Sequence, residues 1–193
     1  MGIESKLAAL SFGCLNVRSC NLTDSTGRNC ISKFTWIIKK KMDFVFLSEL
    51  KFHNKSFLNK LSNFLMSNDI CQYQLILNSS KQSRGTAILV KNSLDFVIQQ
   101  IDKDHNENFI ILNCKINQLN LTLASIYAPS GNFSNFFERV KQKVDAFGHP
   151  YIIGGDFNTI LNPLPNDLNP DLHNHSSQCN VLGTKFINNW MEK

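Results

Sequence analysis

The sequence lacks most of the features that mark specialised classes of protein. None of its apolar runs approaches the ~18 residues that a membrane helix needs. It has no heptad pattern and no repeating glycine, which excludes a fibre. The N-terminus has no apolar signal core. The six cysteines form no C-x-x-C pair, so we expect reduced thiols in an intracellular protein.

The composition is that of an ordinary globular chain. Hydrophobic residues make up 42% and charged residues 18% of the sequence, which is enough apolar material for a buried core. The length of 193 residues predicts one domain, 1–193. Lys and Arg number 20 against 15 Asp and Glu, and the net charge of +5 suits a phosphate-rich partner as well as many plain enzymes.

Hydrophobic periodicity predicts alternating helices and strands. Helical spacing of apolar residues occurs in segments 29–40, 57–65 and 133–147. Strands are predicted at 7–16, 44–47, 73–77, 86–90, 96–101, 108–116, 119–126 and 151–153, with a tight turn at Asn117-Gln118. Three prolines indicate a loop over 162–180, and a helix is predicted to begin near 184. Helices between strands at both ends, with a meander in the middle, favour an α/β fold of mixed sheets covered by helices.

The sharpest motif is Gly154-Gly155-Asp156-Phe157-Asn158, which follows a short buried strand. Two glycines let the backbone turn tightly and approach a ligand closely. Asp156 and Asn158 stand two residues apart, so both project to one side if the chain stays extended. The carboxylate can hold a water, and the amide N–H beside it can donate to a phosphate oxygen. The plainer alternative is a Gly-Asp turn in which Asn158 takes a left-handed conformation.

Three further polar residues occupy similar positions. Glu49 directly follows an apolar strand, Asn16 ends the first strand, and Tyr127 leaves a strand before Ala128-Pro129. Each has a plainer interpretation: a solvated carboxylate, a turn residue and a core or rim aromatic, respectively. All four signals nevertheless lie at the carboxyl ends of predicted strands, where ligand sites gather in α/β folds.

The order of these motifs resembles the endonuclease/exonuclease/phosphatase superfamily. Within it, the sequence is most similar to the endonuclease domain of LINE-type (non-LTR) retrotransposon polyproteins. The matching stretches are Leu15-Asn16-Val17-Arg18, Phe46-Leu47-Ser48-Glu49, Arg84-Gly85-Thr86-Ala87-Ile88-Leu89, Ile126-Tyr127-Ala128-Pro129, Gly154-Gly155-Asp156-Phe157-Asn158 and the following Thr159-Ile160-Leu161-Asn162-Pro163.

The resemblance implies a four-layer α/β sandwich, in which helices cover two mixed β-sheets. It implies DNA as the partner and no membrane, and leaves the oligomeric state open. Glu49 would be the main ligand of Mg²⁺ (or Mn²⁺), with Asn16 beside it ordering metal and phosphate. Tyr127 would contact the scissile phosphate, Asp156 would position or activate the attacking water, and Asn158 would hold that water or a non-bridging oxygen. Phosphodiester hydrolysis needs such a set, because a metal absorbs developing charge while neutral donors avoid repulsion.

The sequence departs from the family in two places. Ser48 stands where Gln is common, and Leu50-Lys51 stand where Thr and His are common; we interpret this as a loop difference. The family also ends with a Ser-Asp-His motif that cleavage requires, and the 193 residues contain none. His173 and His175 fall in the predicted loop and are expected to be solvated. We therefore expect a C-terminally truncated domain that keeps the metal side of the site and has little or no nuclease activity.

Two alternatives to a target-nicking endonuclease remain open. A phosphatase of the same superfamily would act on small phosphorylated molecules, and a distinct substrate loop would favour it. A non-catalytic nucleic-acid-binding fragment or retroelement relic would bind DNA in a salt-sensitive way without cutting it.

Overall fold

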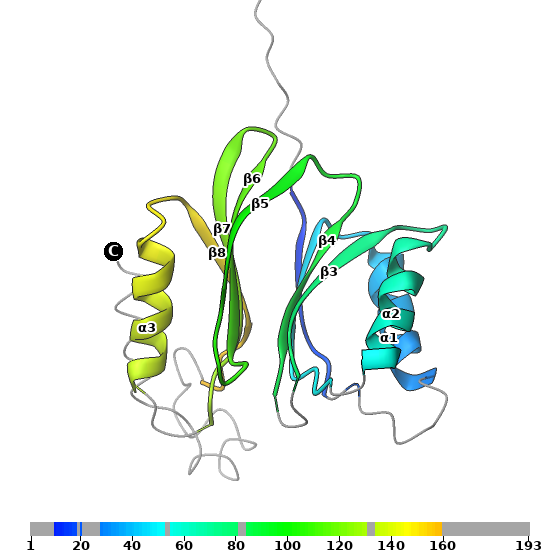
Figure 1. Ribbon diagram of the computed structural model, residues 1–193, viewed down its shortest axis with the longest axis horizontal. Helices are drawn as coiled ribbons and strands as arrows, with labels where there is room; N and C mark the ends of the chain where they lie inside the picture. The colour runs from blue at the N-terminus through cyan, green and yellow to red at the C-terminus, as the bar shows by residue number, and fades with distance from the viewer. Residues whose placement is uncertain are drawn as a thin grey trace, which may run out of the picture.

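Figure 1 shows the computed structural model, which describes residues 10–18, 20, 28–52, 55–80, 84–130 and 134–159. These residues form eight strands and three helices, in the order β1-α1-β2-α2-β3-β4-β5-β6-β7-α3-β8. The strands form two four-stranded sheets that face each other in the middle of the molecule. Helices α1 and α2 cover the outer face of one sheet and α3 covers the outer face of the other (Figure 1). The fold is therefore an α/β sandwich of four layers, as expected from the sequence.

The first sheet contains one parallel pair of strands. Its strands are β1 (Phe12–Asn16), β2 (Phe44–Ser48), β3 (Tyr73–Asn78) and β4 (Thr86–Lys91), in the order β1-β2-β4-β3. Strands β1 and β2 run parallel, and β4 is antiparallel to β2 and to β3. Every residue of β2 is buried, because this strand lies inside the sheet and is covered on both faces.

The second sheet consists of antiparallel pairs followed by one parallel pair at its edge. Its strands are β5 (Phe96–Lys103), β6 (Phe109–Ile116), β7 (Leu119–Tyr127) and β8 (Tyr151–Asp156), in the order β5-β6-β7-β8. The first three form the antiparallel meander, and β7 pairs with β8 in parallel. Asn117 and Gln118 both have positive φ, which is the conformation that a tight β6–β7 hairpin requires, so the predicted turn is confirmed.

The helices are α1 (Arg28–Lys40), α2 (Lys55–Met66) and α3 (Ser134–Asp145). Helix α1 joins the parallel strands β1 and β2, and α3 joins the parallel strands β7 and β8. Such strands cannot be linked by a hairpin, so the chain must cross over the sheet face. Each helix buries one apolar stripe against its sheet, exemplified by Phe34 and Ile38 in α1, Leu61 in α2, and Phe137 and Val140 in α3.

Three apolar layers separate the four layers of secondary structure, and the middle one joins the two sheets. In that layer Phe46 of β2 packs on Gly154 of β8, where an added Cβ would lie 2.4 Å from Cδ2 of the Phe46 ring. Beside it, the buried Ser125 hydroxyl of β7 donates to the Leu47 carbonyl of β2 at 3.0 Å. The glycine therefore sets how closely β2 and β8 approach.

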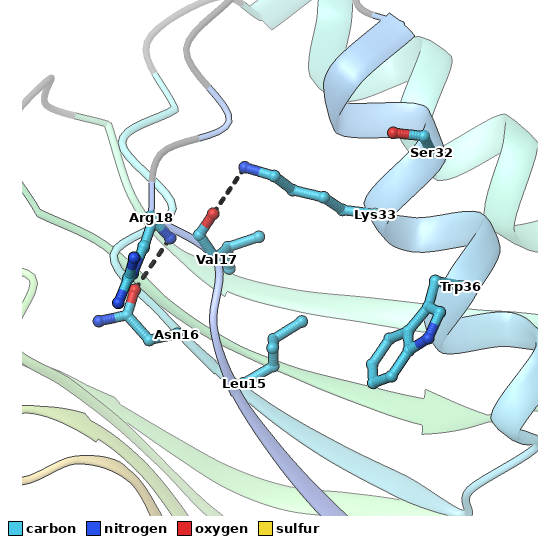
Figure 2. Close-up of a pocket in the computed structure, with 7 residues that line it drawn as sticks. All are labelled: Leu15, Asn16, Val17, Arg18, Ser32, Lys33 and Trp36. Carbon is cyan, nitrogen blue, oxygen red and sulfur yellow. Dashed lines mark hydrogen bonds between the residues drawn. The ribbon is translucent and has the colours of Figure 1, made fainter.

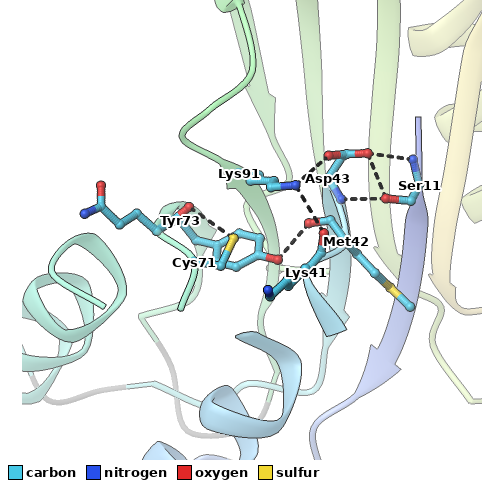
Figure 3. A network of polar contacts seen from close by, with 8 residues as sticks. Ser11, Lys41, Met42, Asp43, Cys71, Tyr73 and Lys91 are labelled. Atoms are coloured by element: carbon cyan, nitrogen blue, oxygen red, sulfur yellow. Dashed lines mark hydrogen bonds and ion pairs between the residues drawn. The ribbon is translucent and has the colours of Figure 1, made fainter. Parts of the chain in front are cut away.

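A polar network ties the strands together at one end of the first sheet (Figure 3). The Asp43 carboxylate accepts from the Ser11 backbone N–H at 2.9 Å and from the Ser11 hydroxyl at 2.7 Å. Lys91, at the end of β4, lies 3.3 Å from the same carboxylate. The Tyr73 hydroxyl donates to the Met42 carbonyl at 2.7 Å. These residues hold together the starts of β1 and β2 and the end of β4.

The predicted elements match the observed ones closely. All three helices and all eight strands are found, and the main shifts are at their ends: the first strand begins at Phe12, and the last reaches Asp156. The five cysteines among the described residues are free thiols. No helix in this part of the chain is long and apolar enough to cross a bilayer. The predicted loop at 162–180, the helix from 184 and both His173 and His175 lie outside the described residues.

Candidate active site

Four strands end at a common edge where the two sheets meet. Strand β1 ends at Asn16, β2 is followed by Glu49, β7 ends at Tyr127 and β8 ends at Asp156. The parallel registers place the ends of each pair side by side. The Asn16 Nδ2 then donates to Asp156 Oδ2 at 2.7 Å, a contact between sheets that joins residues 140 positions apart. The structure thus brings together residues that the sequence presents singly.

The backbone around Glu49 is strained. Both Glu49 and Lys51 have left-handed conformations, with φ of 59° and 56°. A left-handed residue other than glycine costs roughly 1–3 kcal/mol and persists where neighbouring contacts impose it. Here the Leu50 N–H donates to the Gly85 carbonyl at 3.2 Å and the Lys51 N–H to the Arg84 carbonyl at 2.8 Å. The segment after β2 is therefore fixed against the start of β4, with its side chains at the edge.

The Glu49 carboxylate is mostly buried and is held by cationic and amide donors. Its side chain is 19% exposed, and Lys51 Nζ lies 2.6 Å from Oε1. Burial alone would raise the pKa of Glu49, but hydrogen bonds from Lys51 and Asn16 and the charges of Lys51 and Arg18 lower it below its ordinary value. Glu49 is therefore an anion at neutral pH, and the Asn16 amide, which donates to Asp156, also helps to lower the pKa of Glu49.

Asp156 ends strand β8 and follows a residue whose backbone conformation favours glycine. Gly155 has φ of 142°, and a Cβ there would lie 2.0 Å from the Ile126 carbonyl oxygen. After the strand, the Asn158 N–H donates to Asp156 Oδ1 at 3.0 Å. The Asn158 side-chain amide donates to the Ala128 carbonyl, and Asn158 has φ of 45°. The left-handed turn considered for Asn158 is present, and it places this residue directly beside Asp156.

Tyr127 lies within the electrostatic reach of both carboxylates. Burial raises the pKa of its phenol, the charges of Glu49 and Asp156 raise it further, and Lys51 and Arg84 oppose them. The hydroxyl therefore stays protonated at neutral pH and keeps its ability to donate a hydrogen bond. All five residues singled out in the sequence, Asn16, Glu49, Tyr127, Asp156 and Asn158, lie at this edge.

Three basic residues at the site were not singled out from the sequence. Lys51 contacts Glu49, Arg18 acts on the Glu49 carboxyl and Arg84 acts on the Tyr127 phenol. Arg84 also donates to the Asn108 side chain. Arg18 and Arg84 belong to motifs quoted from the sequence, and Lys51 lies in the segment after Glu49 that was interpreted as a loop difference. Together they place near Glu49 and Tyr127 the cations that suit a phosphate group.

A hollow of about 480 Å³ opens beside Asn16 (Figure 2). It lies between the end of β1 and helix α1. Lys33 of α1 reaches across and donates to the Val17 carbonyl at 2.7 Å. Trp36 forms part of the wall and is 53% exposed, which is unusual for so large an apolar side chain. The hollow is lined by Leu15, Asn16, Val17, Arg18, Ser32, Lys33 and Trp36.

The donor set of the site suits a hard cation. Within the described ranges, no group of three or more His, Cys, Asp or Glu gathers as a ready-made metal cage. Glu49 and Asp156 supply carboxylate oxygens, which Mg²⁺ prefers, and Mg²⁺ usually retains several waters with one or two carboxylates. The Asn16 Oδ1 accepts from the Arg18 backbone N–H at 2.9 Å and keeps a second lone pair. The Lys51 ammonium on Glu49 shows that this carboxylate accepts a positive charge at the edge. The residues therefore fit a magnesium-type ion.

The fold and the edge site define the class of protein, and comparison with known proteins agrees. The model of the Endonuclease/Exonuclease/phosphatase family matches residues 16–190 of the chain. The chain belongs to this family.

Solved structures share the fold at low sequence identity. An AP endonuclease from Archaeoglobus fulgidus is 18% identical, with a TM-score of 0.57 over 92% of this chain and 68% of its own length. D. rerio TDP2 complexed with a single-strand DNA product is 19% identical, with a TM-score of 0.58 over 86% of this chain and 64% of its own. The 3′ phosphatase NExo from Neisseria, bound to a product DNA hairpin, is 14% identical, with a TM-score of 0.56 over 95% of this chain and 71% of its own. The chain spans 55% and 59% of two further matched structures, an AP endonuclease from Leishmania major and a humanized D. rerio TDP2.

Proposed function

We propose that this protein hydrolyses phosphodiester bonds of DNA with the help of Mg²⁺, for which Mn²⁺ can substitute. The observation that carries the proposal is the convergence of Asn16, Glu49 and Asp156 from two sheets, joined by the 2.7 Å contact between Asn16 and Asp156. The order of motifs along the chain supports a target-nicking endonuclease of the retroelement type. Family membership supports the general class of reaction.

Glu49 and Asn16 are the residues that would hold the metal. Glu49 is ionised at neutral pH because Lys51 and Asn16 stabilise its charge. A bound Mg²⁺ would supply Lewis-acid stabilisation of the negative charge that develops on the phosphate oxygens. The amide of Asn16 orients the second carboxylate through its hydrogen bond, and so keeps Asp156 in place beside the metal position.

Asp156 is the group best placed to orient an attacking water. Its two carboxylate oxygens each accept one hydrogen bond, from Asn16 and from the Asn158 backbone, and each retains capacity for another. This carboxylate would orient the lone pair of a water bound to it and would accept a proton from that water. The protonated Tyr127 phenol would donate to the phosphate, and we assign Asn158 to the same water or to a non-bridging oxygen.

The hollow beside Asn16 favours a polymeric substrate over a small phosphate. Base stacking on an exposed aromatic ring and cations along the backbone are how single strands are held. Trp36 supplies the ring, and Lys33 and Arg18 supply positive charge next to the proposed catalytic edge. The net charge of +5 is in keeping with a DNA partner.

A plasmid nicking assay tests the proposal. One cut converts a supercoiled circle of several thousand base pairs into a relaxed one, so even the weak activity expected from the sequence is detectable. We expect nicking with Mg²⁺, none with EDTA, and a loss of at least ~10²-fold in Asp156→Ala. Asp145→Ala, at the exposed end of α3, is the matched control and should nick like the wild type.

Equal nicking by wild type and Asp156→Ala would show that the edge residues do not carry the reaction. Salt-sensitive DNA binding without any nicking would favour the non-catalytic binding fragment instead. Release of phosphate from an inositol phosphate without nicking would favour the small-molecule phosphatase.

A further inference from the structure

The contact between Lys51 and Glu49 places a positive charge where the proposed metal would bind. Lys51 Nζ lies 2.6 Å from Glu49 Oε1, and the two side chains are 25% and 19% exposed. The inference from this contact rests on the proposed function, because it concerns the same carboxylate as a metal ligand. It goes beyond that function, because it concerns what the chain itself does to metal affinity.

The backbone fixes this contact. The Lys51 N–H is bonded to the Arg84 carbonyl at 2.8 Å, and both Glu49 and Lys51 are held in left-handed conformations. The two side chains therefore leave a fixed backbone segment close together, and no further backbone entropy is lost when they meet. An exposed, flexible pair of this kind would contribute little.

The ammonium lies inside the site and not at its margin. Lys51 acts electrostatically on the Tyr127 phenol as well as on Glu49. It therefore lies among the groups proposed to bind metal and phosphate. A divalent cation on the Glu49 oxygens would bring two positive centres within a few ångströms of each other, in surroundings less polar than water, where their repulsion is strong.

We propose that Lys51 is a built-in competitor for the metal: its ammonium holds Glu49 in the metal-free protein and must move away when a divalent cation binds. The two cations are alternatives at one carboxylate, so each weakens the binding of the other by the same factor. Lys51 keeps Glu49 paired without metal and sets the metal affinity lower than the carboxylate alone would give.

Binding of Mn²⁺ alone tests this without any measurement of catalysis. Free Mn²⁺ is counted by its electron paramagnetic resonance signal during titration of the wild type and of variants. We expect Lys51→Met to bind Mn²⁺ roughly tenfold more tightly than the wild type, within the usual range of coupling between two ligands. Lys51→Arg keeps the charge and should bind about as weakly as the wild type.

The chain offers a matched control in a second lysine–carboxylate pair. Lys91 lies 3.3 Å from Asp43, with similar exposures of 27% and 16%, at the opposite end of strand β2. Lys91→Met removes the same charge and a comparable ion pair, and its Mn²⁺ affinity should equal that of the wild type. Thermal denaturation without metal confirms that each variant is folded.

The outcomes separate this inference from the proposed function. Unchanged or weaker Mn²⁺ binding by folded Lys51→Met overturns the inference, as does equal tightening by Lys91→Met. If Glu49→Gln loses Mn²⁺ binding while Lys51→Met shows no gain, the metal site stands and only the competition fails. If Glu49→Gln binds Mn²⁺ like the wild type, the metal is not at Glu49 and the proposed function fails with it.

Discussion

Glu49 and Asp156 reach the same edge by different backbone devices. Glu49 occupies a left-handed conformation that a non-glycine residue tolerates only because Leu50 and Lys51 are bonded to the next strand. Asp156 depends on the residue before it, because Gly155 takes a φ of 142° beside the Ile126 carbonyl. Both carboxylates therefore depend on local backbone geometry that their own side chains do not create.

Gly155→Ala should destabilise the protein by about 2–4 kcal/mol, because the new Cβ meets the Ile126 carbonyl oxygen at 2.0 Å and the backbone must shift. Urea denaturation followed by circular dichroism measures the change. Gly148→Ala is the control: its φ is 64°, but no atom lies within 4 Å of an added Cβ, so it should cost only about 1 kcal/mol. Equal losses in the two variants would contradict the steric argument.

At the residue scale, the sequence predicted which side chains lie at the edge better than it predicted their backbone conformations. Asp156 and Glu49 were singled out because acidic residues follow buried strands, and both lie at the edge. The importance of Lys51 was missed and its position interpreted as a loop difference, because nothing in a lysine two residues after a glutamate indicates that both residues have left-handed backbones. That conformation comes from bonds to Arg84 and Gly85, which are distant in sequence.

Strand β2 has a charged pair at each end, with different consequences. At its start, Asp43 joins Ser11 and Lys91 and so holds β1 and β4 in place (Figure 3). At its end, Glu49 and Lys51 form the pair that lies in the proposed site. The first pair is structural, and its energetic effect should therefore appear in stability and not in metal binding.

Asp43→Asn should lower the free energy of unfolding at pH 7 by about 1–3 kcal/mol, the usual value for hydrogen bonds to a charged group. Burial alone would raise the pKa of Asp43, but bonds from Ser11 and Lys91 lower it below its ordinary value. A lowered pKa stabilises the folded state above the unfolded pKa of ~3.9, and that stabilisation is lost as pH falls through the folded value. The difference between wild type and variant should therefore shrink below about pH 4 in urea titrations; a difference that is constant from pH 7 to pH 2 would contradict it.

Element types were predictable because each strand and helix carries its own periodic signal. Helix α1 shows apolar residues at Phe34, Ile37 and Ile38, and all three are buried as the spacing requires. The end of β8 was less predictable, because Gly154 and Gly155 are poor strand residues by propensity. They extend the strand here because β7 pairs with them. The Phe46 ring fills the space beside Gly154, and the Ile126 backbone fills the space beside Gly155.

At the scale of the whole molecule, the site lies where the two sheets meet. Each sheet contributes one parallel pair of strands to it. Helices α1 and α3 return the chain so that β1, β2, β7 and β8 all end at the same edge. Cross-sheet bonds such as that of Ser125 to the Leu47 carbonyl then hold the two halves in register. A site built this way depends on the packing of the entire sandwich.

Trp36→Ala should weaken binding of single-stranded DNA roughly tenfold, because base stacking on an aromatic side chain contributes ~1–3 kcal/mol. Fluorescence anisotropy of a labelled oligonucleotide at fixed salt measures the affinity. Trp36→Phe keeps a stacking surface and should retain most of it, while Mn²⁺ affinity should not change in either variant. If Trp36→Ala binds the oligonucleotide as tightly as the wild type, the hollow of Figure 2 is not part of the DNA-binding surface.

Periodicity alone could not have shown that Asn16 meets Asp156, because nothing local relates residues 140 positions apart. The order of motifs, compared with a known family, supplied that expectation, and the sandwich shows the geometry behind it. The same comparison could not supply the hollow at Trp36, which depends on how α1 lies against the end of β1.

The most direct measurement is a crystal structure of the protein grown with Mn²⁺, in which anomalous scattering locates the metal independently of activity. The account predicts a peak about 2.2 Å from a Glu49 carboxylate oxygen, within the usual range for a divalent cation and oxygen, with Asn16 beside it and Lys51 moved off Glu49. A metal bound elsewhere on the protein, with Glu49 still paired to Lys51, would contradict it.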